Sequence, residues 1–339
     1  MRRGIPPPSG RASRRIPAPD SGAKMNPDWR RRRLLMLFVD GLGMGQPDAA
    51  INPLFRGDCP VLAGLLRTAA FPVDATLGVP GVPQSATGTT TLLTGLNAAL
   101  IAGRHVEGFP GSMLREALSS ENIFLKLRAA GLACAFANAY GAGSLEEASS
   151  GRRFSATTVA ALTGIGRLRL LDDLLAGRAV YHDLTREELR ERGFAVPLIS
   201  PEEAATHLAG IACEHDFTLF EYFQTDRAGH ASDPDRKKKV LSLFDLFLAT
   251  VLRLGSSRGF SVILTSDHGN IEDGLSAAHT MNPVPFIAVE AAGRGPEGAA
   301  CFSWRDRIRS LSDVAPAILD FLQPADADSL NGKGEYCGV

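Results

Sequence analysis

The sequence has few cysteines, and their arrangement does not suggest a covalent framework. Only five occur in 339 residues, an odd number, and none lies in Cys-x-x-Cys spacing. Disulfide scaffolds and cysteine-based zinc sites both need more closely patterned cysteines. The sequence therefore indicates a protein of the reducing cytoplasm, with Cys134 and Cys213 as small side chains in or near apolar segments.

Long apolar runs and a strong net charge are also missing. No apolar stretch approaches the roughly 20 residues of a membrane span, and the N-terminal region lacks the apolar core of a secretory signal. The formal net charge is only −1. We therefore expect neither a membrane nor a nucleic acid as partner. Because 45% of the residues are hydrophobic, the chain can bury a sizeable core.

The charge is unevenly distributed along the chain. Residues 1–33 contain ten Arg or Lys and two Asp, a net of +8, which leaves −9 for the remainder. This segment is rich in Pro, Ser, Gly and Arg, a composition typical of disorder. It is either a genuine basic leader or the product of a start codon upstream of Met25. At the other end, we expect residues 326–339 to form a C-terminal tail.

The sequence does contain a recurring pattern, in which an apolar run is followed by side chains that bind metals. Runs at 34–39, 217–223 and 260–264 have the length of buried strands. In open α/β sheets, ligands bind at the carboxyl ends of the strands, so residues far apart in the sequence can meet there. The residues that follow these runs are Asp40, Asp226, His230, Asp267, His268 and His279.

Six such side chains are too many for one tetrahedral ion and suit two. Two divalent ions can clamp the attacking and leaving oxygens of a phosphoryl group. Such a site needs a nucleophile, and Ser85 is the best candidate because it precedes a segment that can open a helix, whose N-terminus favours phosphate. Thr87, Thr89 and Thr90 are rival nucleophiles, and a simple Thr-rich cap and turn is the alternative interpretation.

The organisation of the chain separates a core from an insertion. A helix over 122–130 followed by a strand over 132–137 is a unit of the kind that builds parallel sheets. Residues 141–200 are first loop-rich and then mainly helical, and Thr185 and Glu188 have the spacing of a capping box. We expect this segment to be a compact cap over the site.

Five segments resemble a known superfamily in their order and separation. They are Val39-Asp40-Gly-Leu-Gly43, Gln84-Ser85-Ala-Thr-Gly88, Thr225-Asp226-Arg-Ala-Gly-His230, Thr265-Ser-Asp267-His268-Gly-Asn-Ile-Glu272 and Ala278-His279-Thr-Met-Asn-Pro-Val-Pro-Phe286. The chain resembles the alkaline phosphatase superfamily, and within it the branch of cofactor-independent phosphoglycerate mutases and phosphopentomutases. The resemblance covers roughly residues 33–323 and includes 311–322, which are similar to the closing helix of the family.

This resemblance implies a three-layer α/β/α sandwich with a mostly parallel central sheet and a small, mainly helical cap. The core is then formed by residues 34–140 and 201–325, and the cap by 141–200. The resemblance also implies two divalent ions, with Mn favoured over Zn, and phosphorylation of Ser85 in a covalent intermediate. It assigns Asp40, Ser85, Asp267 and His268 to one ion and Asp226, His230 and His279 to the other.

The chain also departs from phosphoglycerate mutases. With 339 residues it is too short for the large inserted domain that holds the sugar-acid phosphate in that branch. Where that branch has an acidic residue and a histidine near the nucleophile, this chain has Ala86 and Thr89. The Pro and Arg that follow a sulfatase nucleophile are missing after Ser85 as well. Phosphoglycerate and sulfate esters are therefore disfavoured as substrates.

We therefore expect a two-metal phosphohydrolase that acts on a small phosphate ester through a phosphoserine intermediate. A phosphomutase would share every catalytic residue and is the main alternative. A phosphodiesterase or phosphonate hydrolase, and a non-catalytic protein that binds a phosphorylated ligand, are further alternatives. Donors and cations that could hold the substrate are Arg227, Arg104, Arg152, Arg153, His182 and Asp183.

Overall fold

The structure is a computed structural model that describes residues 32–149, 153–231, 233–291 and 302–323. Nearly all of the predicted basic leader, the predicted C-terminal tail and Arg152 lie outside the described residues.

A six-stranded sheet forms the centre of the molecule, and its three innermost strands are parallel. The strand order is β2-β6-β5-β1-β4-β3. Strand β1 is completely buried and pairs in parallel with β4 on one side and β5 on the other. At one edge of the sheet, β6 pairs antiparallel with β5, and β2 pairs antiparallel with β6. The strands are β1 (Leu34–Val39), β2 (Phe71–Val73), β3 (Cys134–Phe136), β4 (Phe217–Tyr222), β5 (Ser261–Thr265) and β6 (Val284–Val289).

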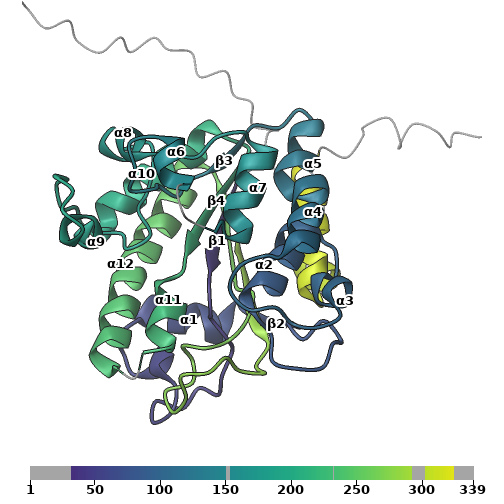
Figure 1. The fold of residues 1–339 in the computed structure, drawn as a ribbon. Coiled ribbons are helices and arrows are strands. Elements are labelled where there is room, and N and C mark those ends of the chain that lie inside the picture. The colour runs from purple at the N-terminus through teal and green to yellow at the C-terminus, as the bar shows by residue number, and fades with distance from the viewer. Residues whose placement is uncertain (1–31, 150–152, 232, 292–301, 324–339) are drawn as a thin grey trace, which may run out of the picture.

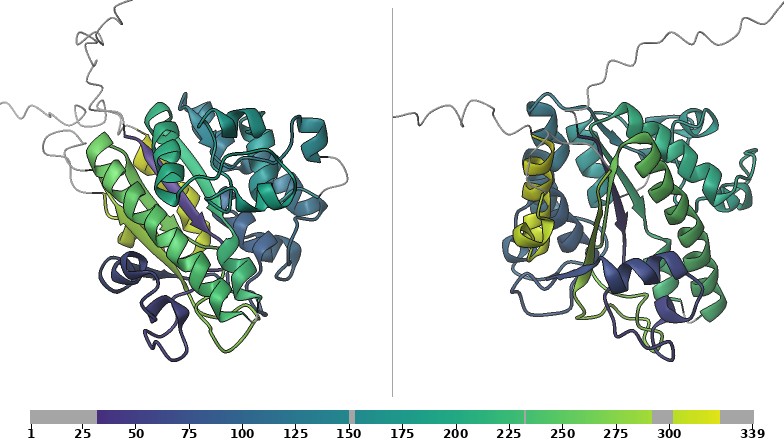
Figure 2. Two further views of the ribbon diagram at one scale, coloured as in Figure 1. Left: turned by 90° about the vertical axis from the view of Figure 1, so that its left-hand side faces the viewer. Right: turned by 180° about the vertical axis from the view of Figure 1, so that it is seen from behind.

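Helices cover both faces of the sheet and bury one hydrophobic cluster on each (Figures 1 and 2). The first face is covered by α2 (Ser85–Thr94), α4 (Ser112–Glu121), α5 (Ile123–Ala129), α7 (Ala156–Gly164) and α14 (Val314–Leu322). The second is covered by α1 (Pro60–Thr68), α10 (Pro201–Glu214) and α12 (Pro234–Arg258). The predicted three-layer α/β/α sandwich with a mostly parallel sheet is confirmed.

The remaining elements are short and lie in the connections. They are η1 (Pro53–Phe55), α3 (Ala98–Ala102), α6 (Leu145–Ser149), α8 (Leu171–Leu175), α9 (Glu187–Glu191), α11 (Gln224–Gly229), α13 (Trp304–Arg307) and η2 (Leu311–Asp313).

The alternation of apolar runs and periodic segments located the core elements to within a few residues. The expected strand at 34–39 has those bounds, and the strand expected over 260–264 begins one residue later. The expected capping box is wrong. Arg186, not Thr185, is the N-cap of α9, and the Glu188 carboxylate contacts Arg227 instead of the helix start.

Helix α7 lies inside the segment expected to be a cap, yet it belongs to one layer of the sandwich. It packs against α2, α4 and α5, and Ala156, Val159 and Ala160 are buried in the cluster on that face of the sheet. The rest of the segment, around α8 and α9, has its own small cluster, which includes Leu174 and Leu189. The extent of the cap stays a prediction, and its best candidate is the part that follows α7.

Helix α12 is, among the described residues, the one helix whose length and composition would allow it to cross a membrane. Its most apolar 18-residue window is 56% buried inside the protein. Phe244 and Phe247 on this helix pack onto the sheet residues Tyr222 and Phe220. This burial is what a core helix of a globular fold shows.

Asp245 on α12 replaces the missing cap of helix α1. The N-cap residue of α1, Cys59, makes no side-chain cap, and the two oxygens of Asp245 accept hydrogen bonds from the backbone N–H groups of Val61 and Leu62 at 3.1 and 2.8 Å. We expect Asp245→Ala to lower the free energy of unfolding by about 1 to 3 kcal/mol, since two buried donors lose their acceptor. Urea denaturation measures the loss. Asp245→Asn, which keeps one acceptor, should lose less, and equal losses in the two variants would contradict this account.

Candidate metal centre

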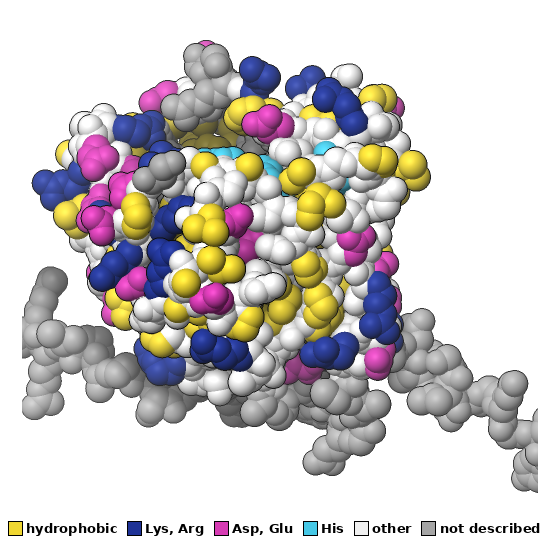
Figure 3. Space-filling view, turned by 90° about the horizontal axis from the view of Figure 1, so that it is seen from below, with side chains coloured by type: hydrophobic (Ala, Val, Ile, Leu, Met, Phe, Trp, Pro, Cys, Tyr) yellow, Lys and Arg dark blue, Asp and Glu magenta, His cyan; other side chains and the backbone are white. Residues whose placement is uncertain are grey.

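The carboxyl ends of three neighbouring strands bring the six expected ligands together. Asp40 follows β1 directly, while Asp226 lies in α11, immediately after β4. Asp267 and His268 follow β5, and His279 lies in the loop that leads to β6. Because β4, β1 and β5 are adjacent and parallel, their loops emerge at one edge of the sheet. Seen from below, histidine side chains lie along the edge of a hollow in this face (Figure 3).

The first group consists of Asp40, Asp267, His268 and Ser85. The ligand atoms of the three titratable residues lie within 4.8 Å of one another. His268 Nε2 is 3.2 Å from Asp40 Oδ1 and 3.7 Å from Asp267 Oδ1. Ser85 Oγ is hydrogen-bonded to the same His268 Nε2 at 2.9 Å. All four side chains therefore point toward one small volume.

The second group consists of Asp226, His230 and His279. Both imidazole Nε2 atoms lie 3.4 Å from Asp226 Oδ1 and 3.0 Å from each other. The rings of His268 and His279 stack with centroids 3.8 Å apart, so the two groups touch. This is the division into two ligand sets that the family resemblance implies.

The charges of this region shift the pKa values of its members strongly. Burial raises the pKa of Asp40 well above its usual range, and the Asp267 carboxylate raises it further. Burial alone would lower the pKa of His268, but the carboxylates of Asp267 and Asp40 raise it to about 10. These carboxylates repel one another at close range, and positive charge between them relieves the repulsion.

The two groups fit divalent metal ions in both donor chemistry and geometry. Carboxylate oxygens and imidazole nitrogens are ligands that Mn and Zn accept. Asp40 Oδ1 and Asp267 Oδ1 are buried and accept no hydrogen bond. A buried carboxylate oxygen without a donor is costly, and a cation would supply its missing partner.

The rival nucleophiles are all occupied by other contacts. Thr87 and Thr90 donate their hydroxyl hydrogens to the carbonyls of Gln84 and Ala86, and Thr89 donates to Asp267 Oδ2 at 2.7 Å. All three threonines are buried. Ser85, by contrast, is half-buried and lines a cavity. Its position favours it over the threonines as the nucleophile.

Helix α2 begins at Ser85, as the sequence predicts, but its first amides do not face an open site. The N–H groups of Ala86 and Thr87 both point at the carbonyl of Val106, at 3.0 and 3.4 Å. The N-terminus of this helix is expected to favour a phosphate, but the N–H groups of Ala86 and Thr87 are already hydrogen-bonded.

Two glycines allow the ligand loops to approach one another closely. Gly41 has φ of +70°, and a Cβ there would lie 2.8 Å from Asp226 Oδ1. A Cβ on Gly88 in α2 would lie 2.7 Å from the carbonyl oxygen of Asp267. Any larger residue at these positions would push the aspartates out of place.

Glu272 connects the loops that carry the ligands, a role that the sequence analysis did not assign. Its buried carboxylate accepts hydrogen bonds from the N–H of Gly43 at 2.9 Å and the N–H of Asn270 at 2.8 Å. It also accepts one from the Thr280 hydroxyl at 2.5 Å and one from Asn282 Nδ2 at 3.1 Å. The loop after β1 and both ends of the long loop between β5 and β6 are thereby held by one carboxylate.

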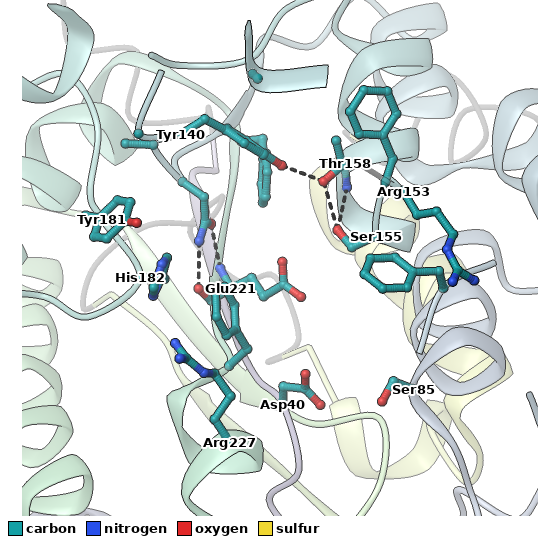
Figure 4. A pocket seen from close by; sticks show the side chains of 18 of the residues that line it. Asp40, Ser85, Tyr140, Arg153, Ser155, Thr158, Tyr181, His182, Glu221 and Arg227 are labelled. Carbon is teal, nitrogen blue, oxygen red and sulfur yellow. Dashed lines mark hydrogen bonds between the residues drawn. The ribbon is translucent and has the colours of Figure 1, made fainter. Parts of the chain in front are cut away.

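A cavity of about 440 Å³ opens above the first group, with Asp40, Ser85 and Asp226 among its lining residues. In Figure 4, Asp40 and Ser85 face each other across the lower part of this cavity. Glu221, inside β4, lines it as well, and burial raises the pKa of its carboxyl to about 7. Because Glu221 lies within an apolar run, the sequence analysis gave it no role.

Only some of the expected substrate-binding residues line the cavity. Arg153 and Arg227 line the cavity, and Arg227 is paired with Glu188 Oε1 at 2.8 Å. Arg104 is exposed and does not line the cavity. Asp183 is buried, and its oxygens accept hydrogen bonds from two backbone N–H groups of the chain entering α9, which is a structural role.

The fold and the donor set define an α/β protein with a metal centre at the carboxyl edge of its sheet. Residues 197–325 match the family model described as Metalloenzyme superfamily. Residues 197–325 are therefore similar to this metalloenzyme superfamily, which agrees with the resemblance seen in the sequence and points to divalent metal ions.

Curated relatives match part of this chain. A 2,3-bisphosphoglycerate-independent phosphoglycerate mutase from Dinoroseobacter shibae is 32% identical over 145 residues, which are 40% of this chain and 27% of that protein. The corresponding protein from Microcystis aeruginosa is 34% identical over 135 residues, 37% of this chain and 25% of that one. The match therefore spans about a quarter of the length of these relatives.

Solved structures support the fold. The PH0037 protein from Pyrococcus horikoshii has a TM-score of 0.50 and 13% identity, with 88% of this chain and all of that chain covered. A cold-active alkaline phosphatase from Shewanella sp. also has a TM-score of 0.50, with 12% identity over 86% of this chain and all of that chain. At this level of identity the likeness concerns the fold alone.

We expect Glu272→Ala to weaken metal binding about 10- to 100-fold, because the Gly43, Asn270 and Thr280 loops lose the acceptor that orients the ligands. Competition with a metal chelator measures the affinity. Glu272→Gln keeps the size and one acceptor oxygen and should lose less. An unchanged metal affinity in a folded Glu272→Ala protein would contradict the orienting role.

Proposed function

We propose that the protein transfers a phosphoryl group from a phosphate monoester to Ser85 and then to an acceptor, with two bound divalent ions. The observation that carries the proposal is the position of Ser85. Its hydroxyl lies at the wall of a cavity, 2.9 Å from His268 Nε2, and the two ligand groups meet beside it. A nucleophile beside two adjoining ligand groups is an arrangement suited to in-line phosphoryl transfer.

Asp40, Ser85, Asp267 and His268 would hold one ion, and Asp226, His230 and His279 the other. When bound, the ions would lower the pKa of the Ser85 hydroxyl and neutralise negative charge on the phosphoryl group. Thr89 helps to position the first ligand group. Its hydroxyl donates a hydrogen bond to Asp267 Oδ2 and leaves Asp267 Oδ1 free to bind an ion.

The proposed reaction has two steps. The Ser85 oxygen attacks phosphorus, the bond from phosphorus to the ester oxygen breaks, and the alcohol leaves with a proton. The oxygen of an acceptor then attacks the phosphoserine, and the bond between phosphorus and Ser85 Oγ breaks, which returns the serine. Water as acceptor gives hydrolysis, and a second hydroxyl of the retained alcohol gives a phosphomutase.

Different observations favour the two acceptors. The curated relatives are named phosphoglycerate mutases, which favours a phosphomutase. His230, however, is 46% exposed, so water has access to the second group, which favours hydrolysis. A mutase must keep its dephosphorylated substrate inside the site, and the segment that would do so is the part of the cap around α8 and α9.

Mn is our first choice of metal and Zn the second. The donor set of carboxylates, imidazoles and one serine contains no thiolate that would select a softer ion. A cytoplasmic location and a small phosphorylated substrate stay predictions of the sequence.

Ser85→Ala is expected to abolish the phosphoenzyme that forms with p-nitrophenyl phosphate, because the attacking oxygen is removed. Mass spectrometry of the intact protein, quenched in acid, detects the added phosphate. Thr87→Val is a matched control, since Thr87 lies on the same helix with its hydroxyl bonded to Gln84. Phosphate on Thr87 or Thr89 in place of Ser85 would contradict the assignment.

Removal of metal with a chelator should eliminate turnover, and Mn or Zn should restore it. The acceptor is identified by running the reaction with a panel of sugar phosphates in ¹⁸O-labelled water. Hydrolysis yields labelled inorganic phosphate, whereas a mutase yields an isomeric ester without label. If no ester shows metal-dependent turnover, the protein is not a phosphoryl-transfer enzyme.

A further inference from the structure

The cavity above Ser85 is lined by many aromatic rings, although a phosphorylated substrate brings charge. Its volume of about 440 Å³ is far larger than a phosphate group needs. The remaining space must therefore receive the alcohol part of the substrate. Six phenylalanine and tyrosine residues line it, namely Phe109, Phe136, Tyr140, Phe154, Tyr181 and Phe223.

One wall is a column of stacked rings. His182 lies between Tyr181 and Phe223, with ring centroids 4.1 and 4.3 Å away. Burial lowers the pKa of His182 to about 4, so its imidazole is neutral near pH 7 and acts as a third uncharged ring. Its Nδ1 is already hydrogen-bonded to Gln224 Nε2 at 2.8 Å. Figure 4 shows Tyr181 and His182 together on one side of the cavity.

The polar groups of the opposite wall are satisfied by one another. The hydroxyls of Tyr140 and Thr158 are 2.5 Å apart, and Ser155 Oγ lies 2.8 Å from Thr158 Oγ1. A substrate that brought hydrogen-bonding groups to this wall would have to break these contacts. The wall therefore suits apolar surface.

The cations of the cavity are mostly engaged as well. No lysine is among the described residues that line it. Arg227 is held by both oxygens of Glu188 at 2.8 and 2.9 Å, and Arg192 donates to the hydroxyl of Tyr181 and the carbonyl of Gly141. A second anionic group on the substrate, such as a carboxylate, would have to compete with these contacts at Arg227 and Arg192, which is costly.

Arg153 and Phe109 lie at the cavity mouth. The Arg153 guanidinium is placed over the Phe109 ring, 5.7 Å from its centroid. Phe109 is 46% exposed, although a phenylalanine side chain loses about 2 kcal/mol by remaining in water. A ring bound in the cavity would cover part of this surface.

From these walls we infer that the substrate is a phosphate monoester whose alcohol carries a flat, uncharged ring, with no second anionic group. The inference rests on the proposed function, since it places the phosphate at Ser85. It names a substrate class different from a phosphorylated sugar acid.

Binding of three phosphonates to the Mn-loaded protein tests the inference without turnover. Phenylphosphonate, methylphosphonate and phosphonoacetate share the phosphonate group and differ in carrying a ring, a methyl group or a carboxylate. Isothermal titration calorimetry should show phenylphosphonate binding at least about 10-fold tighter than methylphosphonate, the order expected for burying a ring against aromatic walls. Phosphonoacetate should bind no tighter than methylphosphonate.

Phe109→Ala should reduce the preference for phenyl over methyl by about 3-fold, because part of the ring surface is lost. Met113→Ala is the matched control, since Met113 is 55% exposed nearby in the sequence and does not line the cavity. It should keep the full preference. The inference is overturned if phenylphosphonate binds no tighter than methylphosphonate, if phosphonoacetate binds tightest, or if none of the three binds.

The phosphonate-binding experiment and the phosphoenzyme experiment can give opposite results, so each tests its own proposal. A protein that forms phosphoserine but shows no phenyl preference keeps its proposed function and loses the ring-bearing substrate. A protein that prefers phenylphosphonate but never forms phosphoserine keeps the ring-binding cavity and loses the proposed chemistry.

Discussion

The repulsion among three aspartates at one edge of the sheet is the constraint on which the rest of the site depends. Asp40, Asp226 and Asp267 follow the three central parallel strands, so the sheet itself forces them together. Asp40 and Asp267 each have one buried oxygen without a hydrogen-bond donor. Only positive charge makes such a cluster stable, whether it comes from a protonated imidazole or from bound metal ions.

The surroundings hold this unfavourable cluster in place. Glu272 accepts hydrogen bonds from the loops around the three aspartates, and Thr89 in α2 donates a hydrogen bond to one oxygen of Asp267. Gly41 and Gly88 supply the space in which the loops and the helix meet. The candidate metal centre therefore depends on these supporting residues as well as on the ligands themselves. Hydrogen bonds from backbone groups help to position the loops that carry the ligands.

The cavity shows how one catalytic edge can serve a different substrate. Its lower end is built from residues shared with the superfamily resemblance, whereas most of its walls come from residues 136–192, together with Phe109 and Phe223. Arg227, expected from the sequence to contact phosphate, is instead paired with Glu188. An ion pair between the segment containing α9 and the helix that carries Asp226 connects the proposed cap to one of the proposed metal ligands.

The amino-acid sequence alone located the central buried strands, the ends of those strands and the candidate ligands, because apolar runs and the polar residues that follow them are local signals. It did not determine which hydroxyl faces the cavity. Ser85, Thr87, Thr89 and Thr90 all lie within one and a half turns of α2, and only the packing of this helix places Ser85 at the cavity. The sequence pattern also did not predict the roles of Glu272, Glu221 and the stacked rings of Tyr181, His182 and Phe223. Their roles arise from contacts between segments distant in the chain, and only the tertiary structure decides such contacts.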